Sequence, residues 1–67
     1  MKPDELRAMT DEQLRQKLEE LRNQVRDLRF AAALGQLKDT SAIRKARKDI
    51  ARILTILTER ERARLAQ

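Results

Sequence analysis

The clearest structural signal in this chain is the segment DEQLRQKLEELRNQVRDLRFAAALG, residues 11–35. Its apolar residues recur at alternating spacings of four and three, which is the a/d pattern of a coiled coil. These seam positions are Leu14, Leu18, Leu21, Val25, Leu28 and Ala32. The pattern predicts one long helix with a single narrow apolar seam.

The same segment carries signals for both ends of that helix. Thr10 is followed three residues later by Gln13, which predicts a capping box, and Met9 and Leu14 occupy the two positions of a hydrophobic staple. Gly35, the only glycine, predicts a left-handed residue just after the last turn. We therefore expect a helix over about residues 11–34.

A second helix is predicted after a short loop at about residues 35–39. Apolar residues again recur at spacings of three and four, with Leu54 beside the seam. The seam positions are Ile43, Ala46, Ile50, Ile53 and Leu57. This helix is expected over about residues 40–65. The candidates for its N-cap are Asp39, Thr40 and Ser41.

The short loop predicts that the two helices pack side by side and antiparallel. The facing seam residues then share one register, in layers that pair Leu28 with Ala46, Val25 with Ile50, Leu21 with Ile53, and Leu18 with Leu57. Residues Lys2–Ala8 can add a short N-terminal helical turn, with Pro3 in its first turn. The predicted fold is all-α: one domain over residues 1–67, built as a coiled-coil-like, antiparallel two-helix hairpin.

The small size and the composition point to a chain that binds a partner. With 67 residues, folding buries only ~60% of the surface that the unfolded chain exposes, so the core is thin. Charged residues make up 40% of the chain and its net charge is +5, which favours a polyanionic partner. The longest apolar run, Phe30–Leu34, is too short to span a membrane, and Met1–Glu5 do not open a signal peptide. We expect a cytoplasmic protein without a membrane partner.

The residue types exclude the usual catalytic sites. The sequence has no His, no Cys and no glycine-rich phosphate loop. Its adjacent acids, such as Glu19 and Glu20, diverge on a helix and cannot work as a pair. We predict that the chain is not an enzyme and that it has no metal site, no cofactor and no small-molecule substrate.

The basic residues are concentrated on the second helix. Residues 1–39 hold eight Lys or Arg and eight Asp or Glu, whereas residues 40–67 hold eight basic and three acidic residues. At 100° per residue, five of the cations of that helix lie opposite its seam. They are Arg44, Lys48 and Arg52 in one row, with Lys45 and Arg47 on its flanks.

Short residues lie within this basic face. Ala51 and Thr55 stand on the same row, so a phosphate backbone can approach closely and the Thr55 hydroxyl can act as an additional donor. The alternative is that the basic face is only the solvated side of an amphipathic helix. The first interpretation predicts binding to nucleic acid.

Phe30, the only aromatic residue, falls outside the seam of the first helix, with Leu34 near it. An exposed pair of this kind marks a contact surface. Phe30 can stack on a base, fill a groove of a partner protein, or fold under the loop with Leu37.

Two stretches resemble the bacterial family of large-subunit ribosomal protein 29. They are LRFAAALGQL at residues 28–37 and IRKARKDIARILT at residues 43–55. The opening Glu5-Leu6-Arg7 and the Met9-Thr10 before the helix are also similar. The resemblance extends over about residues 2–60. The tail at residues 59–67, where acids and arginines alternate, departs from the pattern and is assigned no function.

The resemblance implies a structural constituent of the large ribosomal subunit that binds 23S rRNA through the basic face of its second helix. It also implies a place near the exit of the nascent-chain tunnel, beside large-subunit ribosomal protein 23, where chaperone and signal-recognition factors dock. The positions that match the motifs of the family are Arg29, Phe30, Gly35, Gln36, Arg44, Arg47, Lys48 and Arg52. The predicted RNA contacts are these positions except Gly35, together with Lys45, Ala51 and Thr55.

Two other classes of function remain open at this point. One is a protein-interaction hairpin that forms a bundle with a partner, which the Phe30 and Leu34 pair supports. The other is a small DNA-binding protein of the chromatin type. Sedimentation of the native protein with large ribosomal subunits separates the ribosomal reading from both.

Overall fold

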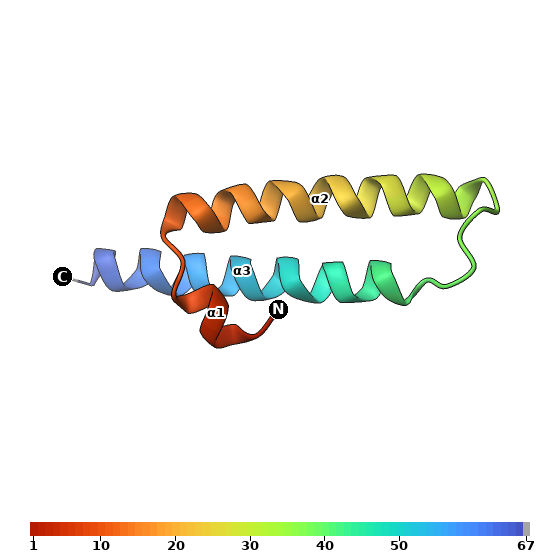
Figure 1. The fold of residues 1–67 in the computed structure, drawn as a ribbon. Coiled ribbons are helices and arrows are strands. Elements are labelled where there is room, and N and C mark those ends of the chain that lie inside the picture. The colour runs from red at the N-terminus through yellow and green to blue at the C-terminus, as the bar shows by residue number, and fades with distance from the viewer. Residues whose placement is uncertain (67) are drawn as a thin grey trace.

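The computed structural model describes residues 1–66 as three helices: α1 (Pro3–Arg7), α2 (Asp11–Ala33) and α3 (Ser41–Leu65). The two long helices run antiparallel, and α1 lies against α3 near the start of α2 (Figure 1). The molecule is elongated, with extents of 50 × 17 × 16 Å. The predicted all-helical hairpin is therefore confirmed, with a short helix at its N-terminal side.

The start of α2 has the predicted capping box. The Thr10 hydroxyl accepts a hydrogen bond from the Gln13 backbone N–H at 3.1 Å, and the Gln13 side chain accepts one from the Thr10 N–H at 2.9 Å. Two backbone donors that the helix itself cannot pair are satisfied in this way.

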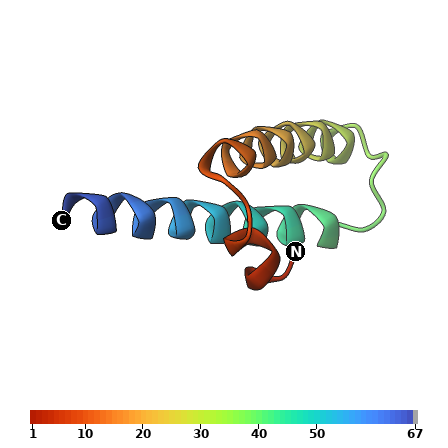
Figure 2. The same ribbon diagram turned by 60° about the vertical axis from the view of Figure 1, so that its left-hand side comes forward.

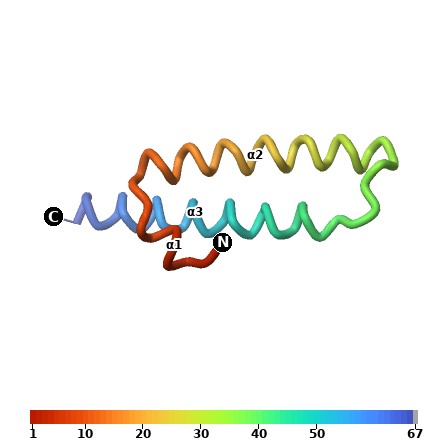
Figure 3. The backbone as a smooth tube through the Cα atoms, viewed as in Figure 1, coloured from red at the N-terminus to blue at the C-terminus, as the bar shows by residue number. Residues whose placement is uncertain are grey.

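The end of α2 is a Schellman motif centred on Gly35. Gly35 has φ +73°, the only positive φ in the described chain. The Gln36 N–H donates to the Ala31 carbonyl at 2.9 Å and the Gly35 N–H to the Ala32 carbonyl at 3.0 Å. These bonds satisfy carbonyls that have no partner inside the helix, and they turn the chain into the loop, whose wide path Figure 3 traces.

The start of α3 divides the capping role between two of the three candidate residues. Thr40 occupies the N-cap position but makes no side-chain capping bond. Asp39 instead accepts hydrogen bonds from the Ser41 N–H and from the Ser41 hydroxyl, each at 2.9 Å. These bonds, the backbone one first, hold the pKa of Asp39 below its usual value of 3.8.

The core follows the predicted seams over most of their length. The buried residues of the long helices are Leu14, Leu18, Leu21, Val25, Ala46, Ile53 and Ile56. Leu28, Ile43, Ile50 and Leu57 are half-buried. Two details differ from the sequence prediction. Ala32 is exposed, because it lies in the last turn before the loop, and Ile56 is buried although it lies outside the predicted seam.

The burial of Ile56 follows from the docking of α1. Leu6 of α1 is fully buried and belongs to the same core cluster as Ile56. In both ribbon views α1 lies beside α3 (Figures 1 and 2). The predicted N-terminal turn is thus a packed element that contributes a core residue.

The C-terminal part of α3 extends past the start of α2 (Figure 2) and is tied to it by arginines. Arg60 donates to the Asp11 carboxylate at 2.8 Å and to the Arg7 carbonyl at 3.0 Å, and Arg64 donates to the other Asp11 oxygen at 3.2 Å. The Arg60 hydrogen bond is the main cause that lowers the pKa of Asp11 below 3.8. The arginines of the tail therefore have a structural role that was not assigned from the sequence.

Candidate nucleic-acid interface

The charge of the chain is divided along its length. Residues 22–53, which form the loop half of the hairpin, hold nine basic and three acidic residues, a net charge of +6. The remaining residues hold seven basic and eight acidic residues. The basic half includes the second part of α2. Its positive charge does not appear when the charges of residues 1–39 are counted together. A polyanion is therefore attracted to the loop half.

The outer face of α3 carries four of these cations without an acidic partner. Within residues 1–66, Arg44, Lys45, Arg47 and Lys48 are exposed and form no ion pair. Three of the four border a shallow depression together with Thr40, Ile43 and Ala51; they are Arg44, Arg47 and Lys48. We call the four cations the outer strip.

Arg52 belongs to the predicted row but is engaged at the contact with the N-terminus. It donates to the Asp49 carboxylate at 3.3 Å and to the Met1 carbonyl at 3.4 Å. Asp49 also accepts a hydrogen bond from the Met1 amine at 3.2 Å, so this carboxylate is shared between Arg52 and the N-terminus.

The Thr55 hydroxyl, a predicted donor to RNA, makes a hydrogen bond within α3 in the free chain. Its hydroxyl donates to the Ala51 carbonyl within the same helix at 2.9 Å. A threonine in a helix interior commonly makes this bond to the preceding turn. Donation to RNA by Thr55 would require this bond to be exchanged for one to the partner, so the donor role stays a prediction.

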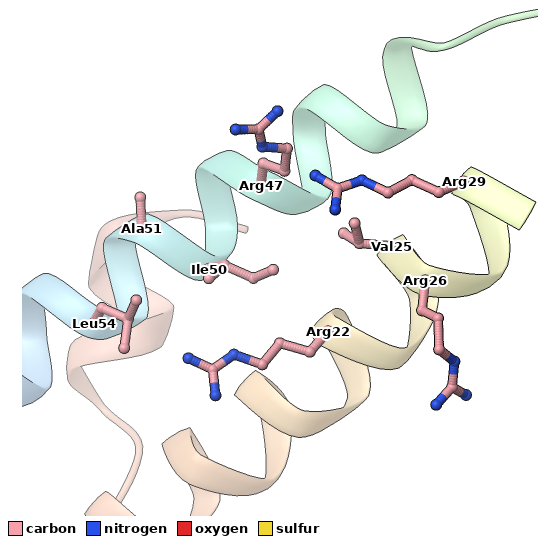
Figure 4. A pocket seen from close by; sticks show the side chains of 8 residues that line it. All are labelled: Arg22, Val25, Arg26, Arg29, Arg47, Ile50, Ala51 and Leu54. Atoms are coloured by element: carbon pink, nitrogen blue, oxygen red, sulfur yellow. The ribbon is translucent and has the colours of Figure 1, made fainter. Parts of the chain in front are cut away.

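A groove between α2 and α3 brings together basic residues of both helices. It has a volume of about 480 Å³ and is lined by Arg22, Val25, Arg26, Arg29, Arg47, Ile50, Ala51 and Leu54. Arg22 and Arg29 extend from α2 towards α3, whereas Arg26 points away (Figure 4). Val25 and Ile50, which the predicted register paired, line this same groove. We call it the arginine groove.

Arg29 and Arg47 were among the RNA contacts predicted from the sequence, whereas Arg22 and Arg26 were not. Arg22, Arg26 and Arg29 follow one another at spacings of four and three, directly beside Val25. That spacing places the three arginines on one side of the helix and was the signal in the sequence. It was overlooked because residues 1–39 as a whole have no net charge. No Asp or Glu lines the groove, so its potential is positive.

The loop end also carries exposed apolar side chains. Phe30 is 67% exposed and Leu34 is 55% exposed, so neither belongs to the core. The prediction that Phe30 lies outside the seam is confirmed, and the chain itself does not cover its ring. Gln36 is also exposed. Neither Phe30 nor Gln36 borders the arginine groove or the depression on the outer strip.

Two kinds of feature are absent from residues 1–66. No cluster of three or more His, Cys, Asp or Glu side chains has an arrangement that holds a metal ion. In that same part of the chain, no helix combines the length and the apolar character required to cross a membrane.

Comparison with known proteins identifies the family. The family model described as Ribosomal L29 protein matches residues 4–60. The chain is 57% identical over 61 residues to Large ribosomal subunit protein uL29 of Thermotoga petrophila, a match that covers 91% of this chain and 92% of that protein. It is 56% identical to the protein of the same name from Syntrophobacter fumaroxidans, with the same coverage. It is 52% identical to that of Persephonella marina, over 91% of this chain and 90% of the relative.

The match covers most of the chain, and the structure is an all-helical hairpin with one basic half. Of the ribosomal, protein-interaction and DNA-binding classes, these findings support the ribosomal one. The chain belongs to the ribosomal L29 protein family, and it is a structural constituent of the large subunit of the cytoplasmic ribosome rather than an enzyme.

Proposed function

We propose that this chain binds large-subunit rRNA through the outer strip of α3. The observation that carries this proposal is the presence of four exposed cations without acidic partners in a half of the molecule whose net charge is +6. Unpaired cations gain the most when they displace counterions from phosphates. The outer strip contains no aromatic side chain, so it holds the backbone of the RNA and does not read its base sequence.

The salt dependence of binding tests this proposal. Replacing Arg44, Lys45, Arg47 and Lys48 with Gln should flatten the slope of log K against log salt by about 3, because each neutralised phosphate contributes roughly 0.7 to 0.9. Binding to purified large-subunit rRNA is measured by filter retention over a salt series. Arg52 is left unchanged because it contacts Asp49 and Met1.

The matched control removes four cations from the other half of the molecule: Lys2, Arg15, Lys17 and Arg62. This variant has the same net charge as the first but should keep nearly the full slope. Equal slopes for the two variants would mean that the outer strip is only a solvated face.

We propose further that the chain lies near the exit of the nascent-chain tunnel, beside large-subunit ribosomal protein 23, where chaperone and signal-recognition factors dock. The family resemblance supports this location. Because the chain has no Cys, a single cysteine at Gln36→Cys or at Glu12→Cys places a cross-linker at one end of the hairpin. One of the two should cross-link to ribosomal protein 23 in assembled subunits. The absence of that product from both would contradict the location.

A further inference from the structure

The arginine groove differs from the outer strip in the chemistry of its lining. Its cations are all arginines, and its floor is apolar, formed by Val25, Ile50 and Leu54. Leu54 is 40% exposed and Ile50 is half-buried, so the chain leaves part of this floor uncovered. Two neighbouring helices thus present an apolar surface between guanidinium groups.

The cations that face the groove are not neutralised by the rest of the chain. Within residues 1–66, neither a side-chain hydrogen bond nor an ion pair engages Arg22, Arg29 or Arg47. Only Arg26, which points away in Figure 4, contacts an acid, at 3.5 Å from Asp27. An anion that enters the hollow gains attraction from several unpaired arginines at once and reduces their mutual repulsion.

A duplex backbone requires only positive charge, which lysine supplies as well as arginine. The guanidinium group is planar, binds phosphate with two parallel hydrogen bonds, and stacks on a flat ring. An apolar floor adds nothing to phosphate binding, but it favours the face of a base that has left its helix. The volume of about 480 Å³ lies in the range of ~300 to 1,000 Å³ that is typical of small-molecule pockets.

From these features we propose that the arginine groove receives a single unpaired RNA nucleotide. The base lies on Val25, Ile50 and Leu54, and Arg22, Arg29 and Arg47 hold its phosphate and border its ring. The proposal rests on the proposed function, because it specifies which feature of the RNA the chain recognises in addition to phosphate charge.

Two RNA probes test this inference: a fully paired duplex, and the same duplex with one bulged adenosine. The full chain is titrated against each probe by fluorescence anisotropy. The chain should bind the bulged duplex about tenfold more tightly, on the order of what the stacking of one base contributes.

Variants then locate the preference. The double variant Arg22→Lys with Arg29→Lys retains the charge of the groove but loses the planar groups, so the two affinities should become nearly equal. Leu54→Gln should reduce the preference for the bulged duplex, because it makes the apolar floor of the groove polar. The matched control is Arg15→Lys with Arg62→Lys, two exposed arginines outside the groove, which should retain it. Circular dichroism verifies that each variant remains helical.

The outcomes separate this inference from the proposed function. Equal affinity of the wild-type chain for both duplexes, with a steep salt dependence, would overturn the inference and leave phosphate binding by the outer strip intact. A preference that survives both groove variants would overturn it as well. A chain that binds neither duplex would contradict the proposed function together with the inference.

Discussion

Gly35 shows how one residue determines where the hairpin turns. Its φ of +73° costs an L-residue with a Cβ about 1 to 2 kcal/mol, and a Cβ built there would meet no atom within 4 Å. Gly35→Ala should therefore lower stability by about 1 kcal/mol through backbone strain alone, which lowers the melting temperature of a domain of this size by roughly 4 to 8 °C. Thermal unfolding followed by circular dichroism measures the change.

The control at the same position is Gly35→Asn, because asparagine tolerates the left-handed region better than alanine does. The Asn variant should melt between the wild-type and Ala variants. If both variants melted at the wild-type temperature, the Schellman motif would not be limiting the stability of the turn.

At the scale of the element, α1 is the unit whose role depends most on packing. Five residues cannot form a stable helix alone, so α1 owes its structure to its contact with α3. Leu6 is fully buried in the same core cluster as Ile56, and truncating it leaves a cavity. Leu6→Ala should lower the free energy of unfolding by ~2 to 5 kcal/mol.

Hydrogen exchange measures this effect locally, because the Leu6 N–H donates to the Lys2 carbonyl and the Ala8 N–H to the Asp4 carbonyl, each at 3.2 Å. Their protection should fall in the Leu6→Ala variant. Leu65→Ala is the matched control, because Leu65 is 76% exposed and its loss should change stability by less than ~0.5 kcal/mol. Unchanged protection in Leu6→Ala would show that α1 is held by polar contacts instead.

At the scale of the whole molecule, the half opposite the loop is held together by ion pairs between distant segments. Asp11 binds Arg60 and Arg64, and Arg60 also binds the Arg7 carbonyl, so the Arg60 guanidinium connects all three helices. The loop half has few such pairs and retains unpaired cations. The acidic residues therefore stabilise one half, and the basic residues of the other half remain available to a partner.

This arrangement predicts a specific response to acid. The pKa of Asp11 is lowered in the folded chain, chiefly by its hydrogen bond from Arg60, so its contribution is complete above the unfolded value of 3.8. The contribution is lost as the pH falls from 3.8 through the lower folded pKa. Asp11→Asn should therefore melt below the wild type at neutral pH, and this difference should shrink below pH 3.8.

The control for this prediction is Glu12→Gln, which changes an exposed acid without an ion pair in the described chain. Its melting temperature should stay close to that of the wild type across the same pH range. A constant difference between Asp11→Asn and the wild type from neutral pH to well below 3.8 would contradict the assignment to Asp11.

The sequence by itself determined the long helices, the two caps of α2 and most of the seams. Capping by Thr10 and Gln13, the turn at Gly35 and the spacing of Leu14, Leu18 and Leu21 act over at most one or two helical turns, so a single stretch of sequence contains the whole cause.

The tertiary structure decided what lies opposite each of these elements. Leu6 lies in a stretch too short to show apolar periodicity, and it became a core residue only because α1 docks on α3. Arg22 and Arg47 share a groove only because the helices lie side by side. Such neighbours depend on how distant segments pack, and helical periodicity reports only the face on which a residue lies.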